Sequence, residues 1–113
     1  MSLATYLDYV DNSGNYVITD ENGFLRNPSD WSREFTITKA LEIDITLTDR
    51  HWQLIDLIRD KYMRLGALPP MRSVCKAVGF EKHELKNQIG SCLALWKIAG
   101  LPDPGEEARA YMS

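Results

Sequence analysis

Apolar residues in the middle of the chain recur every three or four positions, a spacing that places side chains on one face of an α-helix. Thr48 is a suitable N-cap before this run, and Gly66 is a suitable terminator after it. The pattern predicts a helix over residues 49–65 with its apolar face in the core. The residues of that face are Trp52, Ile55, Ile58, Tyr62 and Leu65.

The start of the chain has the composition of β-strands separated by turns. Residues 5–10 and 16–19 are rich in aromatic and β-branched side chains, and residues 11–15 between them have turn chemistry. Asn22-Gly23 then supplies the positive φ angles of a tight turn. We predict a β-hairpin or three-stranded ribbon within residues 1–32. Because a hairpin is only marginally stable alone, we expect it to pack on helices.

Capping residues and helix breakers divide the remaining chain into short helices. A capping region at residues 27–30 predicts a helix from about residue 31 to residue 40 or 41. Pro69-Pro70 begins a helix that ends at Gly79. Its shared apolar face holds Met71, Val74, Cys75 and Val78. Residues 82–89 and 93–98 are two more helical stretches.

Gly100, Pro102 and Pro104 are expected to end regular structure, so that residues 101–113 form a C-terminal arm. The predicted class is α+β, with a β-ribbon at 1–32 packed on four or five helices within 33–100. The helical part has a helix-turn-helix-like portion. The length of 113 residues suits one domain, so we expect residues 1–113 to be a single domain.

The charge balance changes what partners are expected. Thirteen basic residues against sixteen acidic ones give a net charge of -3, which argues against a nucleic-acid partner held by bulk charge. A local basic surface remains open as an interpretation, with a solvated helix face as the alternative. Its members are Arg72, Lys76, Lys82 and Lys86.

Residue types that support catalysis or metal binding do not form a recognised pattern. No glycine-rich loop follows a predicted strand. His51 and His83 are far apart in sequence, with no cysteine pair at zinc spacing, so we expect neither a metal nor another cofactor. Cys75 and Cys92 either fill apolar helix faces or approach each other across two helices. We expect the protein not to be an enzyme.

The first residues do not have the basic and apolar segments of a secretory signal, and no apolar run has the length of a membrane span. Two cysteines in such a chain suit a reducing compartment. We therefore expect a cytoplasmic protein without a membrane partner or an evident small-molecule substrate.

Four segments occur in an order that resembles the DsrC/TusE family, which contains the gamma subunit of dissimilatory sulfite reductase and a related sulfur-relay protein. They lie at residues 47–52, 58–62, 69–72 and 97–104. The most specific of them is the string Lys97-Ile98-Ala99-Gly100-Leu101-Pro102-Asp103-Pro104. The resemblance covers about residues 15–104.

The resemblance implies sulfur transfer by a C-terminal arm. Family members carry a persulfide on a penultimate cysteine, and the sulfite-reductase branch has a second arm cysteine directly before the Lys-Ile-Ala-Gly segment. A thiolate is needed there because it is the nucleophile. The resemblance assigns arm or docking roles to Lys97, Gly100, Leu101, Pro102 and Pro104.

This chain departs from the family at both cysteine positions, which are occupied by Glu107 and Trp96. Neither side chain can hold a persulfide. The sequence therefore predicts a non-catalytic or regulatory paralogue that docks sulfite-reductase or sulfur-relay partners without carrying sulfur. The alternatives are a helix-turn-helix regulator that binds DNA and a sulfur carrier that uses Cys92.

Overall fold

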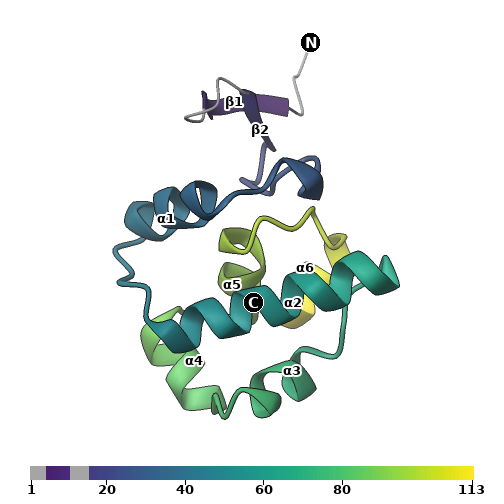
Figure 1. The fold of residues 1–113 in the computed structure, drawn as a ribbon. Coiled ribbons are helices and arrows are strands. Elements are labelled where there is room, and N and C mark those ends of the chain that lie inside the picture. The colour runs from purple at the N-terminus through teal and green to yellow at the C-terminus, as the bar shows by residue number, and fades with distance from the viewer. Residues whose placement is uncertain (1–4, 11–15) are drawn as a thin grey trace.

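The computed structural model describes residues 5–10 and 16–113, and side chains from residue 17 onward. A β-ribbon lies at one end of the molecule, beyond the helices (Figure 1). It pairs β1 (Thr5–Val10) with β2 (Tyr16–Asp20) in antiparallel register, with an irregularity between Leu7 and Tyr9. The predicted turn at 11–15 lies outside the described residues.

The rest of the described chain is helical. A 3-10 turn, η1 (Pro28–Asp30), precedes the α-helices, of which five lie within residues 33–100, as the sequence predicts, and one lies in the predicted arm. They are α1 (Arg33–Glu42), α2 (Asp49–Leu65), α3 (Met71–Ala77), α4 (Lys82–Gln88), α5 (Cys92–Ile98) and α6 (Glu106–Met112). The α+β class is confirmed. No helix among the described residues has the length and apolar character needed to cross a bilayer.

A tight turn after β2 directs the chain towards the helices. The Asp20 carboxylate oxygen Oδ1 accepts hydrogen bonds from the backbone N–H groups of Asn22 at 2.9 Å and Phe24 at 3.0 Å. The third strand of the predicted ribbon is reduced to one bridge between Thr19 and Leu25. Because Phe24 and Leu25 are both buried, this turn attaches the ribbon to the helical part.

Helix α1 begins two residues later than predicted and ends at Glu42. The Ser32 hydroxyl accepts from the Phe35 N–H and so caps the helix, whereas the predicted first residue, Trp31, is still extended. A serine N-cap satisfies an N–H group that has no partner inside the helix. The local cap therefore decides where the helix begins.

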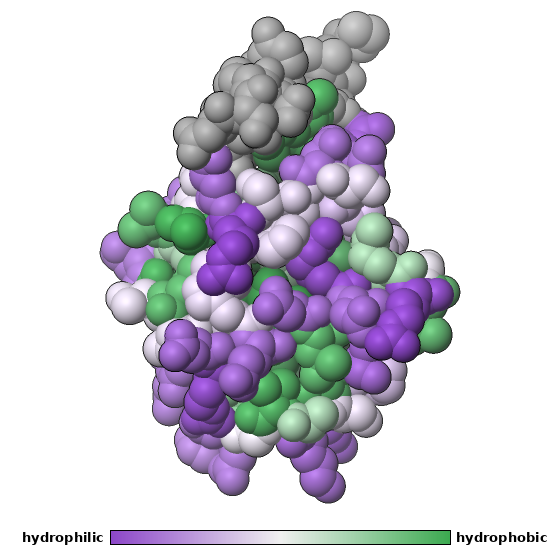
Figure 2. Space-filling model, in the orientation of Figure 1, coloured by the Kyte–Doolittle hydropathy of each residue, from purple (hydrophilic) through white to green (hydrophobic). Residues whose placement is uncertain are grey.

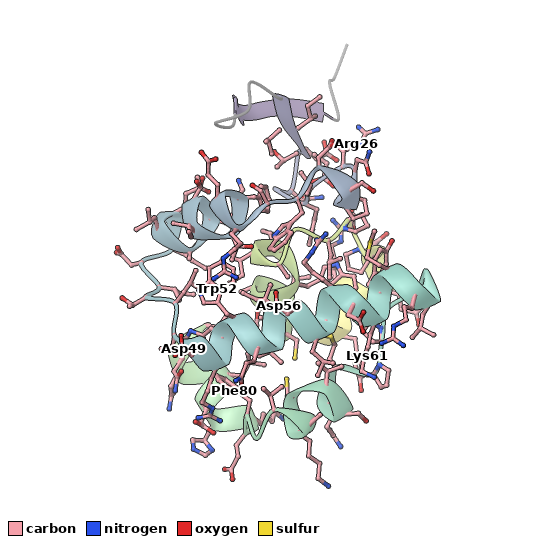
Figure 3. All side chains as sticks on the ribbon, in the orientation of Figure 1. Arg26, Asp49, Trp52, Asp56, Lys61 and Phe80 are labelled. Atoms are coloured by element: carbon pink, nitrogen blue, oxygen red, sulfur yellow. The ribbon has the colours of Figure 1, made fainter. Side chains whose placement is uncertain are left out.

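Helix α2 has the limits that the sequence predicts, and Ile55 and Ile58 are fully buried. Trp52 and Tyr62 are partly buried against the same core. The prediction for Leu65 is wrong, because its side chain is 64% exposed at the last turn, beyond the core. In Figure 3, Asp56 lies on the outward side of α2, opposite this apolar face.

The main core forms where α3, α4 and α5 pack around α2. Leu54, which the sequence pattern does not single out, is fully buried there. A smaller cluster of Val17, Leu25 and Phe35 joins β2 to α1. Both clusters touch Trp31, which links the two parts of the core.

The expectation that regular structure ends at Gly100 is wrong, because residues 106–112 form α6. The chain turns at Gly105, whose φ of 103° suits glycine. Asp103 accepts a hydrogen bond from the Gly105 N–H at 2.9 Å. Met112 of α6 lies in the main core and is only 4% exposed. Burial of this apolar side chain therefore stabilises a helix whose other residues are mostly polar.

Candidate functional site

Residues 96–102, here called the anchored segment, run from the end of α5 into the interior. Ala99 and Leu101 are inaccessible to solvent, and Gly100 is buried. Lys97 is partly buried, with its ammonium group 5.0 Å from the centre of the Phe24 ring. Of the five arm or docking residues implied by the family resemblance, Gly100 and Leu101 are therefore interior positions, and the other three are partly buried.

The carbonyl groups after α5 are satisfied by side chains from distant parts of the chain. The Thr36 hydroxyl of α1 donates to the Ile98 carbonyl at 2.7 Å. Arg59 of α2 donates to the carbonyls of Ala99 at 3.0 Å and Gly100 at 2.9 Å. Helix ends leave carbonyls without partners, and a buried one must be paired to avoid a free-energy penalty.

Arg59 also joins the anchored segment to the N-terminal part. Its second guanidinium nitrogen donates to the Pro28 carbonyl at 2.8 Å, and the group lies 4.2 Å from the centre of the Trp31 ring. Burial lowers the pKa of Arg59 to about 10, while the charge of Asp56 raises it. Arg59 therefore remains charged at neutral pH, and its three bonds are charge-assisted.

Gly100 leaves no room for a side chain. Its φ is 75°, and a Cβ atom there would lie 2.1 Å from Cδ1 of Trp31. The Trp31 indole N–H in turn donates to the Thr36 hydroxyl at 2.7 Å. The glycine of the family string is needed for this close contact.

Trp96, which the family resemblance places at the inner arm-cysteine position, is part of the core. It is 1% exposed, its indole N–H donates to the Pro102 carbonyl at 2.7 Å, and its ring meets that of Tyr62 edge-on. Glu107, at the outer position, is exposed on α6. The two positions thus differ completely in their access to solvent.

Residues 103–112 fold back against the helices. Asp103 and Arg109 form an ion pair at 3.5 Å, and both side chains are about one-third exposed. Pro102 and Pro104 are partly buried. The end of the arm thus has fewer polar bonds to the body than the anchored segment has.

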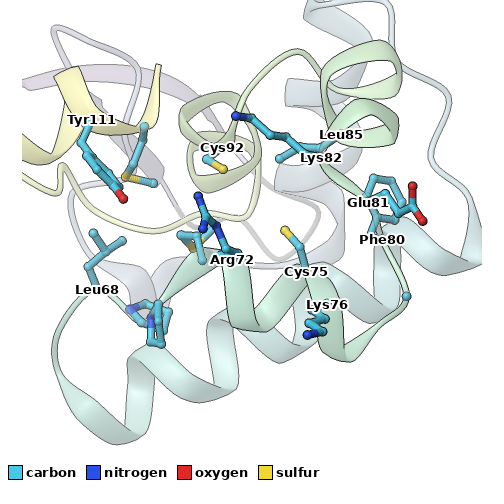
Figure 4. Close-up of a pocket in the computed structure, with 15 residues that line it drawn as sticks. Leu68, Arg72, Cys75, Lys76, Phe80, Glu81, Lys82, Leu85, Cys92 and Tyr111 are labelled. Carbon is cyan, nitrogen blue, oxygen red and sulfur yellow. The ribbon is translucent and has the colours of Figure 1, made fainter.

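Cys75 of α3 and Cys92, the first residue of α5, line one cavity of about 1220 Å³, here called the α6 cavity. Both are free thiols. Their side chains point into the same space (Figure 4). Cys75 also belongs to the main core and Cys92 packs against it, so both alternatives given for the cysteines, filling helix faces and approaching each other across two helices, stay open.

The two thiols are poor nucleophiles at neutral pH. Burial raises the pKa of Cys75 to about 11, and a Cys92 thiolate nearby raises it further. Burial also raises the pKa of Cys92, although the Lys82 ammonium group partly opposes this shift. Because the thiolate is the reactive form, both cysteines are mostly unreactive near pH 7.

Three of the four predicted basic residues meet at the α6 cavity. Arg72 and Lys76 come from α3, and Lys82 is the first residue of α4. Lys86 is exposed on α4 but does not line the cavity. Three of the four residues of the predicted basic surface therefore form part of the wall of this cavity.

His51 has a structural role. Its Nδ1 accepts from the Thr48 backbone N–H at 3.2 Å, which leaves Nε2 as the donor to the Gln88 side-chain oxygen at 2.8 Å. His83 lies at the surface beside Glu81. Within the ranges that the structure describes, no group of His, Cys, Asp and Glu has the arrangement of a metal site.

Sequence reasoning missed Arg59, Thr36 and Trp31. Arg59 had one usable signal, since it is four positions after Ile55 and three before Tyr62, on the apolar face of α2. A charged residue inside such a face usually has buried partners. Thr36 gave no such signal, because its partner is 62 residues away.

The DsrC-like family model matches residues 11–106. A sulfurtransferase TusE from Photorhabdus laumondii is 34% identical over 100 residues, covering 80% of this chain and 90% of the relative. Two solved structures are similar as well. The oxidized gamma-subunit of dissimilatory sulfite reductase from Archaeoglobus fulgidus has 25% identity and a TM-score of 0.73, covering 86% of this chain and 96% of that one.

The second structure, DsrC from Allochromatium vinosum, has 27% identity and a TM-score of 0.74, covering 89% of this chain and 98% of that one. The family match includes the whole anchored segment and ends at the first residue of α6. The resemblance seen in the sequence is thus confirmed over residues 11–106, which include β2 and the helices from α1 to α5. The chain belongs to the DsrC-like family of sulfur-relay proteins.

Proposed function

We propose that this protein docks sulfur-relay or sulfite-reductase partners without carrying sulfur on its arm. The observation that carries the proposal is the state of the two arm-cysteine positions implied by the family resemblance. Trp96 is locked in the core by its bond to the Pro102 carbonyl, and Glu107 offers a carboxylate in place of a thiol. A persulfide needs a thiolate, so neither position can hold one.

The anchored segment supports the docking part of the proposal. Its backbone is fixed by Arg59 and Thr36, so the body would be presented to a partner in one conformation. A surface that is ordered before binding loses less conformational entropy on association. In this proposal the protein regulates or competes with sulfur carriers and is not itself an enzyme.

Incubation with a persulfide donor tests the chemistry. Intact-mass measurement should show no added sulfur on the arm of the wild-type protein, whereas the Glu107→Cys variant should gain one sulfur atom. The matched control Glu106→Cys places a thiol on the neighbouring exposed residue of α6. Loading of Glu107→Cys above this control would show that position 107 is the one suited to the donor.

Competition tests the docking. A persulfide-loaded TusE relative is mixed with the protein to which it passes sulfur, and this chain is added in increasing amounts. We expect transfer to slow as the chain is added, and to slow equally with the Cys75→Ser/Cys92→Ser double variant. No effect on transfer at saturating amounts would contradict the proposal.

One observation favours a second candidate, a sulfur carrier that uses Cys92. This thiol is partly exposed in the α6 cavity, and Lys82 lies close enough to favour its thiolate. However, it is the first residue of a helix and not part of a mobile segment. Rapid stoichiometric loading of the wild-type protein, abolished in Cys92→Ser, would establish this candidate in place of the first.

DNA binding is the less favoured alternative. The matches are to sulfur-relay and sulfite-reductase proteins. The basic residues Arg72, Lys76 and Lys82 line a cavity, where they are poorly placed to follow a phosphate backbone.

A further inference from the structure

The α6 cavity lies where α3, α4, the start of α5 and α6 come together. Its volume of about 1220 Å³ is somewhat larger than that of most small-molecule pockets, which span about 300 to 1,000 Å³. Met71, Phe80, Leu85 and Met112 give it an apolar lining. Apolar surface also reaches the exterior in the lower half of Figure 2, in the region where Figure 1 places α3.

The charges around this cavity are opposite in sign to the net charge of the chain. Arg72, Lys76 and Lys82 line it, against the single carboxylate of Glu81. Glu81 already accepts within the cap of α4 and lies 3.2 Å from the His83 ring. None of the three cations forms an ion pair with any residue that the structure describes. The cavity therefore combines an apolar lining with uncompensated positive charge.

Two of the cations, both exposed, lie near Cys92 in the view of Figure 4. In Figure 4, the Arg72 guanidinium group lies between Tyr111 and Cys92, and the Lys82 side chain passes beside Cys92, whereas Lys76 points away. The Lys82 charge acts on Cys92, which places the two groups near each other. An anionic group seated beside Cys92 would meet Arg72 and Lys82 together.

Residues beyond the family match complete the cavity. The match ends at residue 106, whereas Tyr111 and Met112 of α6 form part of the cavity wall. Tyr111 is 87% exposed, so its ring stands at the mouth, while Met112 reaches the core. This wall is thus an element of this chain that the family match does not include.

We propose that the α6 cavity binds a small molecule with an apolar body and one anionic head group of the carboxylate or sulfonate class. The apolar body lies against Met71, Leu85 and Met112, and the head group contacts Arg72 and Lys82. This site goes beyond the docking function, because it requires no partner protein. Apolar burial provides affinity, and the paired cations select an anion over a cation.

Three probes of matched design test the site on the full-length protein. Octanoate has the apolar chain and the anion, octylammonium has a similar chain with the opposite charge, and acetate has the anion alone. In two-dimensional NMR titrations we expect octanoate to saturate with a Kd on the order of 1 mM or below, with shifts at cavity residues. Octylammonium and acetate should bind at least about tenfold more weakly.

Charge-removing variants locate the head group. Arg72→Gln and Lys82→Gln should each weaken octanoate binding about tenfold, the effect of losing a charge-assisted hydrogen bond. The matched control Lys86→Gln removes an exposed charge from the same helix as Lys82, outside the cavity, and should leave the Kd unchanged. In a Cys75→Ala background, octanoate should also slow alkylation of Cys92 by neutral iodoacetamide.

The results that overturn the proposal are equally specific. Equal binding of octanoate and octylammonium would mean that the cations do not select the ligand. Equal binding of octanoate and acetate would mean that the apolar lining plays no part. Absence of saturable octanoate binding, or equal loss in the Lys86→Gln control, would also overturn it.

Discussion

The anchored segment and the α6 cavity are neighbours in space but are built in opposite ways. In the anchored segment, the carbonyls of Ile98, Ala99 and Gly100 each accept a side-chain hydrogen bond, and Leu101 is inaccessible to solvent. The α6 cavity leaves a large volume unfilled, with two thiols in its wall. The anchored segment is held in place by these hydrogen bonds, whereas the α6 cavity has space for a ligand.

The difference shows where the C-terminal arm can change its course. Moving residues 98–101 would break the bonds from Arg59 and Thr36 and would expose buried carbonyls. Beyond Pro102, the polar contacts are the exposed turn at Asp103 and its partly exposed ion pair with Arg109, and Met112 supplies a buried apolar contact. Partly exposed pairs of this kind contribute little to stability. We therefore expect local unfolding to begin after Pro102 and to leave the anchored segment folded.

The largest loss of stability is expected in the anchored segment, from the Gly100→Ala substitution. The added Cβ would clash with Trp31 at a backbone φ that disfavours alanine. We expect the free energy of unfolding to fall by about 4 kcal/mol or more. The control Gly66→Ala has a similar φ and nothing within 4 Å, so it should cost only about 1 kcal/mol. Equal losses in urea denaturation would show that Trp31 does not constrain Gly100.

The next effect is expected from Arg59→Met, which keeps an apolar stem but removes three hydrogen bonds to buried or partly buried carbonyls. We expect a loss of roughly 3 kcal/mol, because these carbonyls would have no protein donor in their place. Arg64→Met, on the same helix, removes an exposed ion pair with Asp60 and should change stability little. If both variants unfold at the same denaturant concentration, the hydrogen bonds of Arg59 do not stabilise the anchored segment.

Substitutions in the α6 cavity are expected to have the smallest effect on stability. There, the reactivity of the two cysteine thiols is the more sensitive measurement. Because the pKa of Cys75 is raised to about 11, only about one thiol in a thousand is ionised at pH 8. Its alkylation rate should rise about tenfold per pH unit from pH 8 to 10 and level off near pH 11. Mass spectrometry after timed iodoacetamide treatment gives this profile, and a plateau by pH 9 would contradict it.

The partly exposed Cys92 provides the internal comparison for this profile. Its pKa is also raised by burial, but Lys82 opposes the shift and the thiol is more exposed, so we expect Cys92 to be alkylated faster than Cys75 near neutral pH. Lys82→Gln should slow Cys92 near neutral pH and leave Cys75 nearly unchanged. A faster Cys75 would contradict this expectation, because Cys75 is both the more buried thiol and the one that lacks the opposing effect of Lys82.

The sequence by itself determined the features that depend on neighbouring residues. Thr48 and Gly66 define α2, and Pro70 and Gly79 bound α3. The β-branched and aromatic composition before residue 20, with its turn residues, predicts the ribbon. Caps, breakers and turn residues all act within a few positions. The order of the family segments was readable for the same reason. These features set the fold class and the family.

Only the tertiary structure decided how the anchored segment is held and where the thiols lie. Arg59 bonds to residues 40 and 41 positions away, and Thr36 bonds to one 62 positions away. Likewise, α6 is held by burial of Met112, and Cys75 and Cys92 line one cavity only because α3 and α5 pack around α2. Contacts between residues so far apart leave no periodic trace in the chain, since they depend on which buried groups need a partner once the helices have packed.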